Sequence, residues 1–200
     1  MSTIKLKEIR ISNYRSIRDE QTLLIGDEST LIGPNNAGKT NAMRSISILF
    51  GGYENRYGYD RDVDIPFDRL SKKTSIIGQF EIDDSEEWFW EGIDKLHELQ
   101  GTSRDGNQIS LYLYFTETNT PVYNFFTNVK RPQDKKADYS RLLRNLVSEF
   151  VLKFQVIYIP SEKSINDLYK NLLAPRVSSK AAAILSSAMG DLQEELSSIN

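Results

Sequence analysis

Eight consecutive residues have the types and the spacing needed to hold a phosphate group. They are Gly33-Pro34-Asn35-Asn36-Ala37-Gly38-Lys39-Thr40. The run matches the pattern of Gly, four residues, Gly, Lys and then Ser or Thr at every required position. Glycines in such a loop let successive backbone N–H groups turn toward one phosphate, and a helix that follows points the positive end of its dipole at the same anion. The spacing therefore predicts a phosphate-binding loop, or P-loop, at residues 33–40.

Two side chains of this loop have separate predicted roles. Lys39 would reach the β- and γ-phosphates of a nucleoside triphosphate, which makes it the candidate catalytic residue. Thr40 would offer its hydroxyl to a Mg²⁺ ion that bridges the same phosphates, because Mg²⁺ keeps most of its waters and needs few protein ligands. ATP and Mg²⁺ are thus the predicted cofactors. The alternative, a chance glycine-rich turn, does not account for the Gly-Lys-Thr sequence.

A P-loop is positioned by a buried strand before it and a helix after it. Residues 29–32, Ser-Thr-Leu-Ile, form a short β-prone run that enters Gly33. Residues 39–50 carry apolar side chains at spacings of three and four, which predicts a helix that stops at Gly51-Gly52. Both required elements are therefore expected.

Two more strands are expected before the P-loop. Residues 4–11 alternate between isoleucine or leucine and charged residues, apart from one slip at Lys7-Glu8. This pattern predicts a half-buried strand with a bulge. A turn at 13–17 leads to a second strand at 21–25.

The segments after the P-loop helix alternate between strand-like and helix-like patterns. Antiparallel strands are expected at 74–82, 109–115 and 122–129, helices at about 84–99, 139–151, 165–173 and 178–199, and a buried parallel strand at 154–160. Asp83-Asp84 follows the first of these strands. Apolar and polar residues alternate in that strand, as in an antiparallel strand with one solvent-exposed face. We therefore expect Asp84 or Ser85 to cap the next helix, and we do not interpret Asp83-Asp84 as a Mg²⁺-orienting acidic pair.

Composition limits the class of protein. The 200 residues are 39% hydrophobic, which suits one domain with a real core, and the net charge of −3 argues against a basic nucleic-acid-coating module. There is no cysteine, so no disulfide framework or thiolate metal site is expected. No signal peptide or long apolar run occurs, so we expect a cytoplasmic protein that does not enter a membrane.

Two motifs together carry a resemblance to a known group. Residues 9–17, Ile-Arg-Ile-Ser-Asn-Tyr-Arg-Ser-Ile, are closely followed by residues 31–41, Leu-Ile-Gly-Pro-Asn-Asn-Ala-Gly-Lys-Thr-Asn. This pair resembles the start of the ABC-type ATPases of the RecF, SMC and OLD group, in which an I-x-N-[FY]-[RK]-S turn precedes a G-x-N-x-[AS]-GK-[ST]-N loop. The Asn-Asn-Ala-Gly-Lys-Thr-Asn form is most similar to OLD-type ATPases, many of which carry a C-terminal nuclease. The resemblance covers residues 1 to about 50.

The resemblance implies a fold and a domain layout. The fold class is an α/β P-loop NTPase, ABC-ATPase-like, with a mixed sheet, an antiparallel β region at about 74–129 and the start of a helical lobe. Residues 1–160 would be the N-terminal part of the ATP-binding domain, and residues 161–200 the start of the helical lobe. Because the last expected helix has no terminal cap, we expect the intact protein to be longer.

The resemblance also implies the residues that bind ATP. Arg15 would contact a phosphate, the loop would cradle the triphosphate, and Asn41 would lie beside it. The implied set is Arg15, Gly33, Asn35, Asn36, Ala37, Gly38, Lys39, Thr40 and Asn41, with Thr40 also the Mg²⁺ ligand. The alternative for Arg15 is a solvated side chain in an exposed turn.

Parts of an ABC-type site are missing from the sequence. Hydrolysis needs an acidic Asp-Glu after a buried strand, the Walker B motif, and a Leu-Ser-Gly-Gly signature from a partner subunit, and neither occurs here. The only glutamine near the 154–160 strand is Gln155, at its beginning, so no Mg²⁺-sensing glutamine is assigned. We therefore expect the chain to bind ATP and to hydrolyse it poorly alone.

Two functions remain open. In the first, the intact protein is an ATPase that dimerises head to tail around two ATP molecules and controls DNA processing in repair or anti-phage defence, with an appended nuclease. In the second, the chain is a nucleotide-gated protein-interaction module that makes no DNA contact. A small-molecule P-loop kinase is less favoured, because such enzymes usually begin with the P-loop strand itself.

Overall fold

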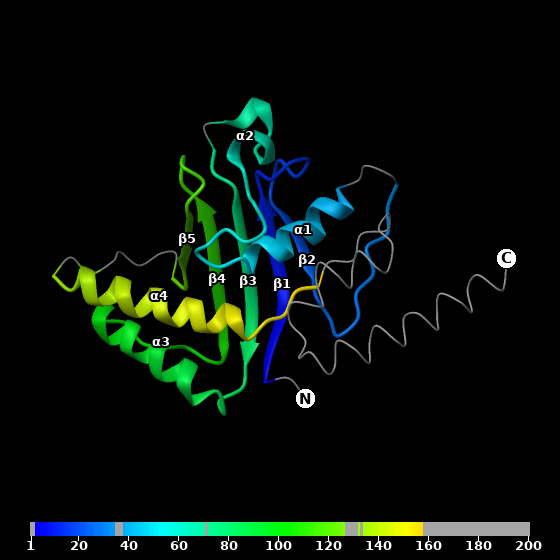
Figure 1. Ribbon diagram of the computed structural model, residues 1–200. Helices are drawn as coiled ribbons and strands as arrows, with labels where there is room; N and C mark the ends of the chain where they lie inside the picture. The colour runs from blue at the N-terminus through cyan, green and yellow to red at the C-terminus, as the bar shows by residue number, and fades with distance from the viewer. Residues whose placement is uncertain (1–2, 35–37, 71, 127–131, 133, 158–200) are drawn as a thin grey trace, which may run out of the picture. The chain divides into compact units, whose positions relative to one another are not determined.

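The computed structural model describes residues 3–34, 38–70, 72–126, 132 and 134–157. These residues form a five-stranded sheet in the order β2-β1-β3-β4-β5, and every neighbouring pair is antiparallel (Figure 1). The strands are β1 Ile4–Ser12, β2 Gln21–Leu24, β3 Ser75–Ile82, β4 Gln108–Phe115 and β5 Pro121–Asn124. The helices are α1 Lys39–Leu49, α2 Arg61–Asp64, α3 Glu87–Gln100 and α4 Lys136–Leu152, with a 3₁₀ turn, η1, at Phe67–Arg69.

The bulge predicted in β1 is present. The pairing of β1 with β3 shifts between Leu6 and Glu8, so Lys7 is the extra residue. The shift has a clear physical reason, since side chains in a strand alternate between faces and one inserted residue returns Ile9 and Ile11 to the buried face. Both isoleucines are fully buried.

One face of the sheet carries the core. Alternate residues of β3 are buried, and Phe80 lies among them with ring centroids 5.0 Å from Phe150 of α4 and 6.0 Å from Phe50 at the end of α1. A Cβ placed on Gly78 of β3 would lie 2.7 Å from Leu49 Cδ2 of α1, so the missing side chain lets α1 approach the sheet closely. Helices α1 and α4 therefore cover the same face, as Figure 1 also shows.

Most of the predicted elements are confirmed, with small changes at their ends. Helix α3 begins at Glu87, later than expected, and its capping position is Glu86, not Asp84 or Ser85. The Asp83 carboxylate instead accepts a hydrogen bond from the Ser85 amide at 2.9 Å, because a short acidic side chain readily closes a turn with the backbone two residues on. The short helix α2 was not predicted.

The strand predicted immediately before the P-loop is wrong. Residues 29–34 have no strand structure and are exposed, with Ile32 91% accessible to solvent. A parallel strand is stable only between paired neighbours and under helices on both faces, and no described residue pairs with this segment. Residues 154–157 are likewise not a strand, so the part of the chain that the structure describes contains no parallel strand.

Several predictions fall outside the described residues. Residues 127–129 were expected to end the strand at 122–129, and residues 158–160 to end the strand at 154–160; both lie there, as do the two helices expected beyond residue 160. The proposed change of domain at residue 160, and with it the mixed character of the sheet, stays a prediction.

Candidate phosphate-binding site

Lys39 occupies the position expected for the phosphate-binding lysine of the loop. It is the first residue of α1, and its ammonium Nζ donates hydrogen bonds to the carbonyl oxygens of Gly33 at 2.6 Å and Pro34 at 2.8 Å. The side chain therefore folds back across the first half of the loop. Residues 35–37, where Asn35, Asn36 and Ala37 were predicted to contact phosphate, lie outside the described residues.

Gly38 needs the conformational freedom of glycine. Its φ of +87° is in the left-handed region, where a Cβ costs about 1–2 kcal/mol. A Cβ at this position would also lie 3.0 Å from Ser16 Oγ and 3.9 Å from Ile17 Cγ1. The P-loop therefore lies so close to the turn between β1 and β2 that Ser16 Oγ would have to shift to accept a Cβ here.

The first turn of α1 is linked to the same turn by a hydrogen bond. Asn41 Nδ2 donates to Ser16 Oγ at 2.8 Å. Thr40, the second residue of α1, is exposed. The first N–H groups of a helix have no partner within it, so those of Lys39 and Thr40 can meet an anion. One predicted site residue, Asn41, is thus joined to Ser16, which follows Arg15 in the sequence.

The turn between β1 and β2 is tight and carries strain. Tyr14 and Ile17 exchange backbone hydrogen bonds of 2.8 Å in both directions, which encloses Arg15 and Ser16 in a two-residue turn. Arg15 has a φ of +50°, which is uncommon for a residue with a side chain. Positive φ values outside glycine often mark functional sites, where the surroundings hold the strained backbone in place.

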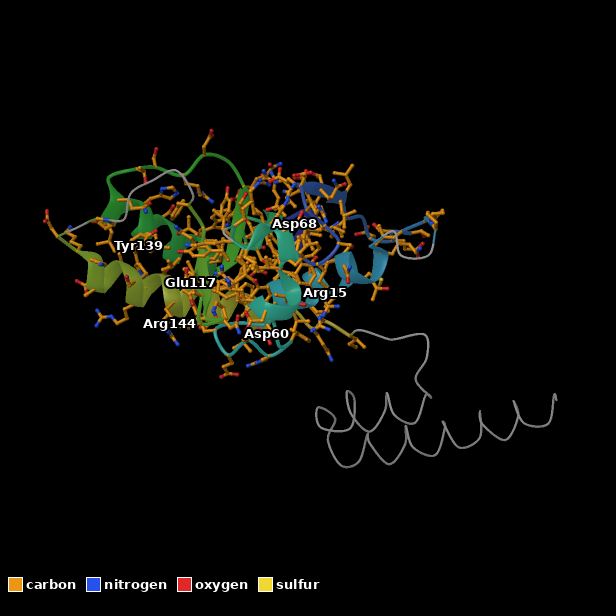
Figure 2. All side chains as sticks on the ribbon, turned by 90° about the horizontal axis from the view of Figure 1, so that it is seen from above. Arg15, Asp60, Asp68, Glu117, Tyr139 and Arg144 are labelled. Carbon is orange, nitrogen blue, oxygen red and sulfur yellow. The ribbon has the colours of Figure 1, made fainter. Side chains whose placement is uncertain are left out.

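Arg15 is not a solvated side chain. Its Nε donates to Asp64 Oδ1 at 2.6 Å, its backbone N–H donates to the Asp64 carbonyl at 2.6 Å, and its side chain is 28% exposed. Figure 2, which looks onto this end of the sheet, shows Arg15, Asp60 and Asp68 grouped around α2. The simple alternative of a free surface arginine is therefore wrong.

Asp64 is the residue that sequence reasoning missed. It ends α2 and is 1% exposed, although the sequence around it reads only as a polar loop followed by a turn. Its effect extends to Tyr14, whose pKa is raised to about 12 first by burial and then by the negative charge of Asp64. A buried carboxylate is uncommon unless it is paired, but pairing with a residue 49 positions away leaves no local signal in the sequence.

The sequence as a whole matches a family model. The model of the AAA ATPase domain matches residues 4–196. The chain belongs to this family. No curated protein matches it.

The solved structures similar to this chain include SMC ATPases. One chain, from a study of ATP-driven dimerization and DNA-stimulated activation of SMC ATPases, is 13% identical with a TM-score of 0.50, covering 92% of this chain and 98% of that one. The Smc head domain of Pyrococcus furiosus, bound to the C-terminal domain of ScpA, is 16% identical with a TM-score of 0.42, covering 72% and 33%. The Pyrococcus yayanosii Smc head domain is 14% identical with a TM-score of 0.43, covering 72% and 26%. The present chain thus spans about a third or a quarter of these last two.

The family and the fold confirm the resemblance seen in the sequence. The chain is an AAA ATPase domain, and it shares its fold with an SMC ATPase. Its assignment to the OLD type stays a prediction.

Among the described residues no group of three or more His, Cys, Asp or Glu side chains could hold a metal ion. The described part of the chain also has no helix long and apolar enough to cross a membrane.

Proposed function

We propose that this chain binds Mg²⁺ and ATP in the loop at 33–40. The observation that carries the proposal is the close approach of Gly38 to Ser16, which joins the P-loop to the turn that bears Arg15. Phosphate oxygens can replace the Gly33 and Pro34 carbonyls as acceptors for the Lys39 ammonium, because its three N–H donors are free to rotate.

Each predicted residue has a role in this site. The backbone N–H groups of the loop surround the β-phosphate, Lys39 neutralises the β- and γ-phosphates, and Thr40 ligates Mg²⁺. Arg15 contacts a phosphate from the side of the β1–β2 turn. Asn41 keeps the first turn of α1 against that turn through Ser16. The loop residues Asn35, Asn36 and Ala37 contribute mainly through their backbone.

The domain works as part of a larger assembly. We infer that two copies of the intact protein pair head to tail around two ATP molecules, since an SMC ATPase with the same fold undergoes ATP-driven dimerization. The 200 residues contain neither a Walker B Asp-Glu nor a Leu-Ser-Gly-Gly signature, so the chain alone is expected to hydrolyse ATP slowly. Lys39 is the catalytic residue that the chain itself supplies.

DNA is the proposed partner of the intact protein. Activation of the similar SMC ATPase is DNA-stimulated, and the Asn-rich P-loop is most similar to OLD-type ATPases. We propose a cytoplasmic role in DNA repair or anti-phage defence, with a nuclease as the processing activity. The second candidate, a nucleotide-gated interaction module without DNA contact, is favoured by the net charge of −3.

Calorimetric titration with ATP and Mg²⁺ tests the site. Lys39→Ala is expected to weaken binding about ten- to hundredfold, because a hydrogen bond to a charged group contributes about 1.5–3 kcal/mol. Lys95→Ala is the matched control, since Lys95 is an exposed helical lysine on α3 whose described ion pair, with Glu91, is 3.8 Å long. Equal binding by the wild type and Lys39→Ala would contradict the proposal.

A second experiment separates the two candidate functions. DNA binding by the full-length protein that falls steeply with salt and is lost in Lys39→Ala would support DNA processing, because phosphate contacts release counterions. ATP-dependent assembly without DNA affinity would support the interaction module.

A further inference from the structure

The carboxylate of Asp64 is fully engaged and almost fully buried. Its Oδ1 accepts from Arg15 Nε at 2.6 Å, and its Oδ2 accepts from the backbone N–H of Asp60 at 3.0 Å. The Asp60 carbonyl in turn accepts from the Asp64 amide at 2.7 Å. A buried carboxylate needs such partners, because burial removes its hydration and only hydrogen bonds or a nearby cation offset that free-energy cost.

The same residue holds the Arg15 backbone. The carbonyl of Asp64 accepts the Arg15 N–H at 2.6 Å, so Arg15 is held at the main chain and at the side chain by one residue. Arg15 has a φ of +50°, a conformation that persists only when surrounding contacts fix it. Asp64 supplies two of those contacts.

The start of α2, next to Asp64, is held by the turn between β4 and β5. The Asp60 carboxylate accepts from Asn119 Nδ2 at 3.2 Å, and Asn119 Oδ1 accepts from the Arg61 backbone N–H at 2.8 Å. Asn119 lies in the turn between β4 and β5. Helix α2 therefore cannot shift freely, and a side chain fixed to it has a defined place.

The contact with Asp64 leaves part of the Arg15 guanidinium available. A guanidinium carries five N–H donors, and the described hydrogen bond uses only the one on Nε. The two terminal nitrogens can therefore face a phosphate while Nε stays with the carboxylate, which a lysine ammonium cannot do with the same geometry. The neighbouring residue Ser16 already touches the P-loop side through Asn41.

We propose that Asp64 is a positioning residue of the nucleotide site, which holds Arg15 so that its terminal nitrogens meet the phosphates of ATP. This inference rests on the proposed function. It assigns a role in ATP binding to α2, a segment outside the P-loop and outside the Asn-Tyr-Arg-Ser turn.

Asp64→Asn tests the role because it keeps the size of the side chain and removes its charge. In calorimetry with ATP and Mg²⁺ we expect about three- to tenfold weaker binding. Asp68→Asn is the matched control: the Arg18–Asp68 pair has the same 2.6 Å distance and joins the same two segments, but it is exposed. That variant should bind ATP within twofold of the wild type.

A double-mutant cycle distinguishes positioning from a general effect on the fold. In an Arg15→Ala background, Asp64→Asn should not weaken ATP binding further, because the side chain that it positions is gone. The melting temperature, in contrast, should respond to Asp64→Asn in this background. Arg15→Ala leaves a buried carboxylate without its cation, so Arg15→Ala/Asp64→Asn should melt higher than Arg15→Ala alone.

Arg15→Lys keeps the proposal testable if Asp64→Asn does not fold. The lysine can retain the ion pair and the fold but cannot serve carboxylate and phosphate together, so ATP binding should fall with little change in melting temperature. If folded Asp64→Asn or Arg15→Lys binds ATP as the wild type does, while Lys39→Ala does not, this inference fails and the proposed function stands. If the wild type itself binds no ATP, both fail.

Discussion

At the scale of single residues, Gly38 lets the P-loop approach the turn between β1 and β2. This P-loop residue caps α1 with a φ of +87°, and a Cβ on it would lie 3.0 Å from Ser16 Oγ. Sequence spacing identifies Gly38 as a loop glycine. The structure adds a second reason for the glycine, the close approach of Ser16, which lies 22 positions earlier.

Gly38→Ala is expected to lower the free energy of unfolding by about 1–2 kcal/mol and to weaken ATP binding. The new Cβ would meet Ser16 Oγ at 3.0 Å and push the turn away from the loop. Urea denaturation and calorimetry measure the two effects. Gly106→Ala is the control, since its φ of +69° gives a similar backbone penalty with nothing within 4 Å of the Cβ. Weaker ATP binding in both variants would contradict this account.

The residues of the P-loop could be predicted from the sequence, but Asp64, the partner of Arg15, could not. Lys39, Thr40 and Gly38 follow from a fixed local spacing, and such spacing is visible in one chain. Arg15 was selected by resemblance, and the structure adds that it is paired. Asp64 could not be selected, because an acidic residue in a polar loop has no signature until the fold brings its partner near.

At the scale of elements, α1 is fixed at both ends. Its start is held by Asn41 and Ser16, and its end by Tyr123 of β5. The Tyr123 hydroxyl donates to the Leu49 carbonyl at 3.0 Å and accepts from the Gly52 amide at 3.1 Å. Burial is the main reason that the pKa of Tyr123 is raised, so the hydroxyl keeps its proton.

Tyr123→Phe is expected to cost about 1–3 kcal/mol of unfolding free energy, because it leaves a helix-end carbonyl and an amide without their partner. Tyr114→Phe on the neighbouring strand is the control. The described contact of Tyr114 is that of its ring with Lys73 at 4.9 Å, and phenylalanine retains that contact. Equal stability of Tyr123→Phe and the wild type in urea denaturation would show that the end of α1 is held by other contacts.

Elements were predictable where their pattern is local. Alternation gave β1 with its bulge, β3 and β4, because an antiparallel strand with one buried face shows that face directly. The expected strand at 29–32 failed because a short apolar run forms a strand only when a neighbour pairs with it. The sequence of the run says nothing about where that neighbour is.

At the scale of the whole molecule, Glu86 joins the start of the chain to the helical layer. Its carboxylate accepts from the Thr3 hydroxyl at the start of the sheet and from Trp88 Nε1 at 2.5 Å. These two hydrogen bonds, that of Thr3 first, lower the pKa of Glu86 below its ordinary value of 4.5.

Acid should therefore destabilise the fold in part through Glu86. A carboxyl group with a lowered pKa in the folded state contributes stability that is complete above pH 4.5 and is lost as the pH falls through the folded value. Glu86→Gln should reduce the loss of unfolding free energy below pH 4.5, and Thr3→Val should reduce it partly. Urea denaturation at several pH values measures this, and an unchanged slope in Glu86→Gln would contradict it.

The class of the whole domain was predictable from its first 50 residues. The P-loop indicated an ATPase domain, and the family match over residues 4–196 confirms that class. The proposed assembly and DNA contact involve other molecules, and no pattern in these 200 residues specifies them.

The central claim is that the P-loop and the Arg15 turn form one ATP site. Hydrogen–deuterium exchange with and without ATP and Mg²⁺ tests it most directly, because ligand binding slows the local opening of the segments that hold the ligand. We predict slower exchange in peptides covering 33–41 and 13–17 together, and no change in Lys39→Ala. Protection of 33–41 without 13–17, or of neither segment while ATP is bound, would contradict the account.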